Sequence, residues 1–215
     1  MPARPKPPPA TTVHFVRHGK TPTTGSVLPG RAKGLHLADE GRQQAEAVAE
    51  RLSAIKKVDA VYASPLERTR ETAAPIAKRL GLRVAIERGL LECDFGDWTG
   101  RKLKELAKLP EWTTVQRYPS GFRFPNGESF AEMQARITGT IGSLVARHPG
   151  GAVVVVSHAD PIKAAIASAL GTHLDLFQRI VISPCSVTTV LYGAGGPAVL
   201  GVNSVTGDLA SLQPS

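Results

Sequence analysis

Cysteine is scarce in this sequence, and aromatic residues are few. Cys93 and Cys185 are the only cysteines among 215 residues, and their separation fits neither a disulfide framework nor a cysteine-based metal motif. We therefore expect a protein of the reducing cytoplasm. Aromatic residues make up 5% of the chain, so the core is expected to consist mainly of valine, leucine, isoleucine and alanine.

Long apolar runs are also missing. No run approaches the roughly 20 residues that a membrane-spanning helix needs, so no membrane segment is expected. Residues 1–11 are rich in proline and lack the apolar core of a signal peptide, which predicts a disordered or polyproline II tail. Residues 206–215 are expected to form a loose C-terminus. Residues 12–205 are then long enough for a single domain with a substantial core.

Positive charge is plentiful but dispersed. The formal net charge is +8, which favours anionic partners in general. A nucleic-acid-binding surface would require a lysine and arginine cluster with interleaved aromatic residues, and the sequence has none. A basic site for a small phosphorylated substrate explains the charge equally well, so nucleic acid is not an expected partner.

Short apolar runs alternate along the chain with segments in which apolar residues recur every three to four positions. This alternation predicts an α/β fold, a three-layer α/β/α sandwich around a mostly parallel sheet. Two later β-rich segments, joined by a glycine-rich turn, predict a hairpin and one antiparallel edge strand. The expected strands cover about residues 12–17, 58–63, 83–87, 152–157, 186–192 and 198–202, and the main helices about 39–55, 65–80, 129–147 and 161–170.

Residues 93–130 interrupt the alternation. They are punctuated by proline and glycine and hold most of the aromatic residues. A long insertion of this kind in a compact domain is typical of a lid or specificity loop, here expected over the C-terminal ends of the strands. The alternative is that its aromatic side chains only pack the insertion itself.

One segment superficially approaches a phosphate-binding P-loop. It runs from Gly25 to Ala32, but Arg31 stands in place of the lysine and Ala32 in place of the magnesium-binding serine or threonine. The segment also does not lead directly into a helix. We therefore reject a nucleotide-hydrolase interpretation.

Two apolar runs end in a histidine. Residues 13–16 lead into Arg17, His18 and Gly19, and residues 152–156 lead into Ser157 and His158. Ligand sites of open α/β sheets lie outside the carboxyl ends of the strands. The two stretches are therefore expected to build one site from distant parts of the chain.

Four segments, in the same order along the chain, are similar to the histidine phosphatase superfamily, which includes the cofactor-dependent phosphoglycerate mutases. Arg-His-Gly alone is a weak signal, whereas all four segments together are specific, and the resemblance covers about residues 12–203. The segments are Arg17 to Gly19, Ser64 to Ala73, Leu91 and Glu92 together with Phe95 to Gly100, and Ser157 with His158.

The resemblance implies a catalytic role for five residues. His18 would attack phosphorus and become phosphohistidine, and Glu92 would protonate the leaving oxygen and later deprotonate water. Arg17, Arg68 and His158 would hold the phosphoryl oxygens. Guanidinium groups stay charged and match these oxygens with planar forks, so neither a metal nor another cofactor is expected.

Further residues are expected to bind substrate. The backbone amides of Gly19 and Ala159 are candidate donors, the latter at a helix start. The family pattern places an asparagine five residues after the glycine, where this chain has Thr24, with Thr21 or Thr23 as alternative donors. Arg31 and Arg101 are the candidate cations for the rest of the substrate.

The second helix leaves one question open. Ser64 and Pro65 are expected to be its N-cap and first residue. The helical wheel places Arg70 nearer the apolar stripe, whereas the family position is Arg68 in the first turn. We follow the family position.

The favoured function is a phosphomonoester phosphatase that acts on a small phosphorylated metabolite. A phosphoglycerate mutase-like phosphomutase with the same site is the alternative. From a different class, the chain could be an inactive phosphate-binding scaffold that docks through its proline-rich tail. Association into a homodimer is left open.

Overall fold

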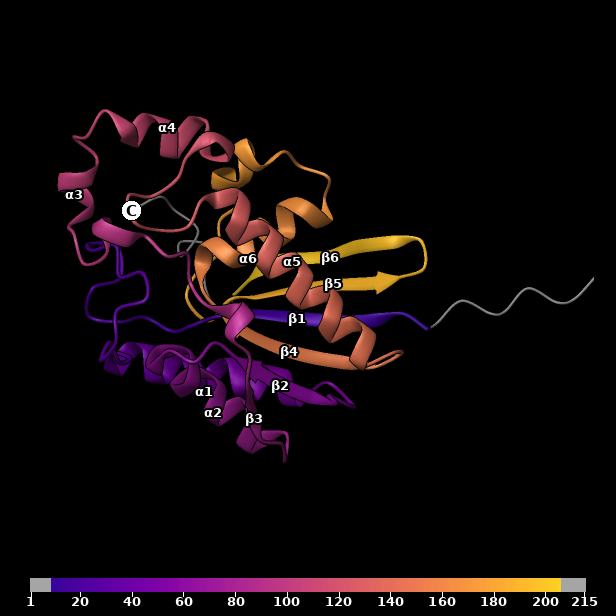
Figure 1. Ribbon diagram of the computed structural model, residues 1–215. Coiled ribbons are helices and arrows are strands. Elements are labelled where there is room, and N and C mark those ends of the chain that lie inside the picture. Colours follow the sequence, from indigo (N-terminus) through magenta and orange to yellow (C-terminus); the bar gives the residue numbers. More distant parts are fainter. Residues whose placement is uncertain (1–8, 206–215) are drawn as a thin grey trace, which may run out of the picture.

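Six strands form one mixed sheet at the centre of the molecule (Figure 1). The structure is a computed structural model that describes residues 9–205. The strand order is β3-β2-β4-β1-β5-β6. The strands are β1 (Thr11–Arg17), β2 (Ala60–Ala63), β3 (Val84–Ile86), β4 (Ala152–Ser157), β5 (Val187–Gly193) and β6 (Gly196–Ser204).

The middle of the sheet is parallel. β4 lies between β1 and β2 and pairs in parallel with both, and β2 pairs in parallel with β3. Five of the six β4 residues are buried, as its continuous apolar run predicts for a strand covered on both faces. β5 is the antiparallel strand, and β6 returns beside it as the edge, so the predicted antiparallel edge is a two-stranded hairpin.

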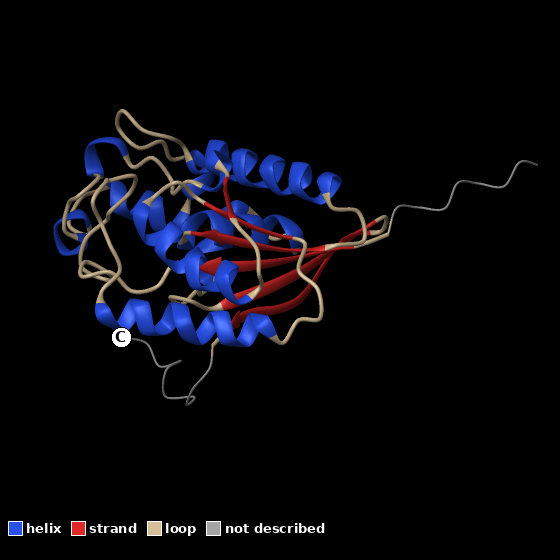
Figure 2. Ribbon diagram, turned by 90° about the horizontal axis from the view of Figure 1, so that it is seen from below, coloured by secondary structure: helices blue, strands red, loops and turns tan. Residues whose placement is uncertain are grey.

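Helices cover both faces of the sheet (Figure 2). Alternate β4 side chains divide between two hydrophobic clusters: Val154 and Val156 pack with the helices α1 and α2, while Val153 and Val155 pack with α5 and α6. The predicted three-layer α/β/α sandwich is therefore confirmed. These helices are α1 (Asp39–Ser53), α2 (Glu67–Arg79), α5 (Phe130–Arg147) and α6 (Ala159–Ala169).

The insertion lies beyond the carboxyl ends of the parallel strands, at the left of Figure 1. Its aromatic rings pack on one another, with ring centroids 4.8 Å apart for Phe95 and Phe124 and 5.5 Å apart for Trp98 and Phe122. Its short elements are η2 (Gly96–Trp98), α3 (Leu103–Leu106), α4 (Glu111–Arg117) and η3 (Pro119–Gly121). Two more short elements are η1 (Arg88–Leu90) and η4 (Leu174–Arg179).

Some predicted boundaries shift in the structure. Thr11 was expected in the tail but is the first residue of β1, because its backbone pairs with Tyr192 and its hydroxyl donates to the carbonyl oxygen of His148 at 2.7 Å. Helix α2 begins at Glu67, so Ser64 is not its N-cap. Pro9 and Ala10 of the predicted tail are also described, and the backbone N–H of Gly150 donates to the carbonyl oxygen of Pro9 at 3.1 Å. Residues 1–8 of the predicted tail and the predicted loose C-terminus, residues 206–215, lie outside the described residues.

Candidate active site

The ends of β1 and β4 bring the two strand-end histidines together. The register pairs Arg17 with Ser157, and the backbone N–H of His18 donates to the carbonyl oxygen of Ser157 at 3.0 Å. The next residue of each strand is therefore a histidine. The ring centroids of His18 and His158 lie 5.2 Å apart, edge to face, and both side chains are buried.

The ring of His18 is held in one tautomer. Its Nδ1 lies 2.8 Å from the carbonyl oxygen of Gly19, which can only accept, so Nδ1 carries the proton. Burial, and then the positive charges of Arg68 and Arg17, place the pKa of His18 well below its ordinary value. The imidazole is therefore neutral near pH 7, and Nε2 presents a free lone pair.

Gly19 serves packing rather than ligand binding. Its backbone N–H donates to the hydroxyl of Thr72 at 3.0 Å, so it is not free for a phosphate. A Cβ on Gly19 would lie 2.5 Å from the carbonyl oxygen of Gly41, at the start of α1. The glycine is thus required where the chain leaves β1 against that helix.

Two arginines present guanidinium groups with spare buried donors. Nη1 of Arg17 donates to the carbonyl oxygen of Ile182 at 2.7 Å, and Nη2 of the fully buried Arg68 donates to the carbonyl oxygen of Gly30 at 2.8 Å. Nε of Arg17 and both Nε and Nη1 of Arg68 are buried without a partner in residues 9–205. Buried unpaired donors on a cation are costly, which favours a site that an anion completes.

Arg68 and Arg70 point in different directions. Arg68 lies close enough to His18 and Glu92 for its charge to act on both, although it does not line the cavity beside them. Arg70 is exposed and lines a different hollow together with His36. The geometry therefore associates Arg68 with the strand-end histidines and Arg70 with the surface.

His158 is positioned by Ser64, which was expected to be the N-cap of the second helix. The Oγ of Ser64 lies 2.9 Å from Nε2 of His158, and both side chains are fully buried. The remaining ring nitrogen, Nδ1, has no partner within the described chain. Burial, followed by the charge of Arg68, places the pKa of His158 well below its ordinary value. The ring is therefore neutral.

Glu92 is a buried carboxyl group with a raised pKa. Burial is the larger cause and the negative charge of Asp160 the second, and together they raise the pKa of Glu92 to about 7 against the opposing charges of Arg68 and Arg17. The backbone N–H of Cys93 donates to its Oε1 at 3.0 Å. A carboxyl group titrating near neutral pH can serve as both acid and base.

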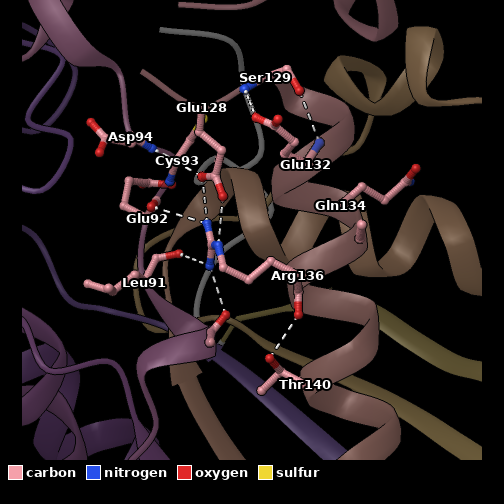
Figure 3. A network of polar contacts seen from close by, with 12 residues as sticks. Leu91, Glu92, Cys93, Asp94, Glu128, Ser129, Glu132, Gln134, Arg136 and Thr140 are labelled. Atoms are coloured by element: carbon pink, nitrogen blue, oxygen red, sulfur yellow. Dashed lines mark hydrogen bonds and ion pairs between the residues drawn. The ribbon is translucent and has the colours of Figure 1, made fainter. Parts of the chain in front are cut away.

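A charged network holds the backbone around Glu92 (Figure 3). Arg136 on α5 donates to the carbonyl oxygens of Gly89 and Leu91, at 2.8 Å each, and forms an ion pair with Glu128, Nε to Oε1, at 2.8 Å. Neither Glu128 nor Arg136 was predicted from the sequence. Glu128 precedes α5, and Arg136 lies eight positions further along, a spacing that no common helix-pair or capping motif identifies.

Arg31, expected to bind substrate, joins this network instead. Its Nη2 pairs with Oε2 of Glu128 at 3.0 Å, and its Nε donates to the carbonyl oxygen of Glu92 at 2.9 Å. Its donors are thus satisfied by the protein, and it does not line the cavity beside His18. Arg101, which follows the turn after η2, does not line that cavity either.

A cavity of about 420 Å³ opens beside His18. A larger hollow of about 600 Å³ lies elsewhere and contains neither strand-end histidine, so size alone does not identify the site. Of the residues predicted to act or bind, five line the 420 Å³ cavity: Arg17, His18, Thr24, Glu92 and Ala159.

Thr24 occupies the position of the expected asparagine. Its Oγ1 accepts from the backbone N–H of Thr21 at 2.9 Å and lies 3.0 Å from the Thr21 hydroxyl. Thr23 is 3.4 Å from the same Thr21 hydroxyl. The three hydroxyls form one cluster on the loop after β1, of which only Thr24 reaches the cavity wall.

Two charged cavity residues were missed by the sequence argument. Asp160 lies in the first turn of α6 and Lys163 directly after that turn, with Nζ of Lys163 3.3 Å from Oδ1 of Asp160. Their place just after His158 was the available signal, since the first turn of a helix that begins at a strand end faces the ligand edge. Within residues 9–205, no cluster of three or more histidine, cysteine or acidic side chains could hold a metal ion.

Comparison with known proteins gives one consistent result. The family model described as the histidine phosphatase superfamily (branch 1) matches residues 13–205. Phosphoserine phosphatase 1 of Hydrogenobacter thermophilus is 35% identical over 161 residues, which are 69% of this chain and 72% of that protein. A protein of Cronobacter sakazakii named "Probable phosphoglycerate mutase GpmB" is 31% identical over 183 residues, 84% of each chain.

A solved structure shares the whole architecture. The mycobacterial glucosyl-3-phosphoglycerate phosphatase superposes with a TM-score of 0.83 at 26% identity, covering 91% of this chain and 100% of the other. Among the described residues, no helix is long and apolar enough to cross a membrane.

Proposed function

Because this chain belongs to the histidine phosphatase superfamily, we propose that it hydrolyses small phosphomonoesters through a phosphohistidine on His18. The predicted class, a phosphoric monoester hydrolase, is confirmed by relatives that are named as phosphatases. The assignment of individual residues to steps is our proposal. A cytoplasmic location, a homodimer and independence from metal stay predictions.

In the first step, the lone pair on Nε2 of His18 attacks phosphorus in line with the ester oxygen. The N–P bond forms as the P–O ester bond breaks, and Glu92 gives its proton to the departing alkoxide. The guanidinium groups of Arg17 and Arg68, with His158, stabilise the charge on the equatorial oxygens. The step requires a neutral His18 and a protonated Glu92.

In the second step, water attacks phosphohistidine. Glu92, now a carboxylate, takes a proton from the water as its oxygen bonds to phosphorus. The N–P bond breaks, its electrons return to Nε2 of His18, and inorganic phosphate leaves. Glu92 regains its proton, so both groups are ready for another turnover.

One observation carries the proposal: a neutral His18 with its Nε2 free lies beside buried, unpaired arginine donors. The hydrogen bond to Gly19 supports Nε2 as the attacking atom. A general acid such as Glu92 typically contributes about 10²–10⁴-fold to the rate. The unpaired donors of Arg68 favour an anion with several oxygens over a neutral ligand.

The second candidate function is a phosphomutase. It is favoured by the similarity to the Cronobacter protein that is named as a phosphoglycerate mutase. The two activities share the phosphoenzyme and differ in whether water or a second alcohol accepts the phosphoryl group.

The test is hydrolysis of p-nitrophenyl phosphate by the wild type and by His18→Ala. We expect the variant to fall to the background rate while it keeps its melting temperature. His36→Ala is the matched control, because His36 is exposed and does not line the cavity. Undiminished hydrolysis by folded His18→Ala would contradict the proposal. Isomerisation of phosphoglycerate without release of phosphate would favour the phosphomutase.

A further inference from the structure

We propose that the cavity beside His18 selects monophosphate esters of apolar, ring-sized or short-chain alcohols over esters that carry a second negative charge. This inference rests on the proposed function and adds the chemical class of the alcohol. The observation behind it is that apolar side chains from separate segments line the cavity, while within residues 9–205 its lining holds two cations, Arg17 and Lys163.

The apolar lining comes from three parts of the chain. These parts are the loop after β1, the insertion with its two short helices, and the segment after η4. The side chains that form these walls are Leu28, Leu103, Trp112, Val115, Phe124 and Ile180.

Only some of the insertion's aromatic residues reach this cavity. Trp98 and Phe122 are buried in the core and do not line it, and Tyr118 is 57% exposed. Trp112 and Phe124 do line it. The insertion therefore both packs on itself and supplies one apolar wall of the site.

Positive charge in the cavity is limited. Its cationic lining residues are Arg17, which we assign to the phosphoryl group, and Lys163. Nζ of Lys163 lies 3.3 Å from Oδ1 of Asp160 and 3.0 Å from Oε1 of Gln178, and 5.8 Å from the ring centroid of Phe177. Its charge is therefore already matched within the protein.

A second anionic group would meet an ion pair, Asp160 with Lys163, whose two charges already compensate each other. The basic residues of the insertion do not help, because neither Arg117 nor Arg123 lines the cavity. Arg123 instead pairs with Glu132 and donates to the carbonyl oxygen of Gly127. Bringing a carboxylate into this lining would cost its hydration, and neither lining cation is free to offset that cost, because Lys163 is paired with Asp160 and Arg17 is assigned to the phosphoryl group.

The experiment measures kcat/KM for esters whose alcohols are similarly poor leaving groups. Ethyl, propyl, butyl, pentyl and 2-phenylethyl phosphate are compared with phosphoserine, 3-phosphoglycerate and glycerol phosphate. Burial of a methylene corresponds to about fourfold in binding. We expect kcat/KM to rise by roughly two- to fourfold per methylene and to be lowest for 3-phosphoglycerate.

Two variants test whether the preference for apolar alcohols depends on the apolar residues that line the cavity. Trp112→Ala and Leu28→Ala remove apolar surface that two different segments contribute, and both residues are only partly buried, so the fold should tolerate the change. Each should lower kcat/KM for 2-phenylethyl phosphate by about tenfold. Turnover of glycerol phosphate should fall by less than that of 2-phenylethyl phosphate, since glycerol gains little from an apolar wall. Tyr118→Ala is the control, an exposed aromatic residue of the same insertion.

The outcomes distinguish a failure of the proposed alcohol preference from a failure of the proposed phosphatase activity. Turnover that rises along the alkyl series and depends on Trp112 and Leu28 supports the inference. A flat series, or 3-phosphoglycerate equal to or better than 2-phenylethyl phosphate, overturns the inference but leaves the phosphatase intact. No hydrolysis of any ester overturns the proposed function and the inference with it.

Discussion

Nδ1 of His18 donates a hydrogen bond to the carbonyl oxygen of Gly19, 2.8 Å away, and so the free lone pair lies on Nε2. The bond joins neighbours in sequence and therefore needs only the tight turn that follows β1. That turn exists because Gly19 and Gly41 allow the chain to leave the strand directly against α1. One local contact thus sets both the orientation and the tautomer of the proposed nucleophile.

The first prediction concerns this tautomer. Nitrogen chemical shifts of the His18 ring, measured by long-range proton–nitrogen correlation, should show a protonated Nδ1 and an unprotonated Nε2 at pH 7. A pH titration should give His18 a pKa well below the usual value of about 6.5, because burial and two arginines disfavour the cation. The His18→Gln variant assigns the signals. An imidazolium, or a proton on Nε2, at neutral pH would contradict the account.

The second prediction concerns the pH profile. Glu92 must be protonated for the first step, so activity should fall as the pH rises through its pKa of about 7. Asp160→Asn removes a like charge and lowers that pKa, which moves the alkaline limb of kcat/KM to lower pH. Asp39→Asn, an exposed position on α1, should leave the limb in place. An upward shift in Asp160→Asn would refute this role of the charge.

The third prediction concerns the serine beside His158. Ser64→Ala removes the hydrogen-bond partner of Nε2 and lets the His158 ring rotate away from the phosphoryl oxygens. A lost buried hydrogen bond of about 1–2 kcal/mol corresponds to roughly five- to thirtyfold in kcat/KM. Ser53→Ala, on the exposed face of α1, serves as the matched control. Full activity of Ser64→Ala would show that His158 needs no such support.

The fourth prediction concerns the network behind Glu92. Glu128→Gln keeps the size of the side chain but leaves the guanidinium groups of Arg31 and Arg136 without their shared carboxylate. We expect a loss of about 1–3 kcal/mol in the free energy of unfolding. For a chain of this size each kcal/mol lowers the melting temperature by about 2–4 °C. Glu46→Gln, an exposed control, should melt like the wild type, and an unchanged Glu128→Gln would refute the structural role of the pair.

The parts of the fold with a strong periodic signal were predictable. The β4 run predicts a central buried strand, and the strand–helix alternation predicts a parallel sheet. Together they predict that His18 and His158 emerge at one edge, and the β1–β4 pairing brings them there. The hairpin followed from its glycine-rich turn, although which of its strands forms the edge depends on the pairing of β5 with β1.

Long-range polar contacts were not predictable in the same way. Arg31 looked free because a sequence does not show which cations already have partners. The fold gives Arg31 the carboxylate of Glu128, 97 positions away. Ser64 fitted an N-cap by type and spacing, yet its hydroxyl is hydrogen-bonded to His158, which follows the neighbouring strand β4. In each case tertiary contacts outweighed the local preference.

The central claim is that the phosphoryl group passes through His18. The direct measurement is rapid quenching of the enzyme during turnover of a radiolabelled phosphomonoester, followed by peptide mapping under alkaline conditions that preserve phosphohistidine. The account predicts label on the peptide that contains His18, lost in His18→Ala. With radiolabelled p-nitrophenyl phosphate, whose leaving group departs without a proton, the label should accumulate in Glu92→Gln, because this variant then slows only the attack of water. Label on another residue, or turnover by His18→Ala at the rate of the wild type, would contradict it.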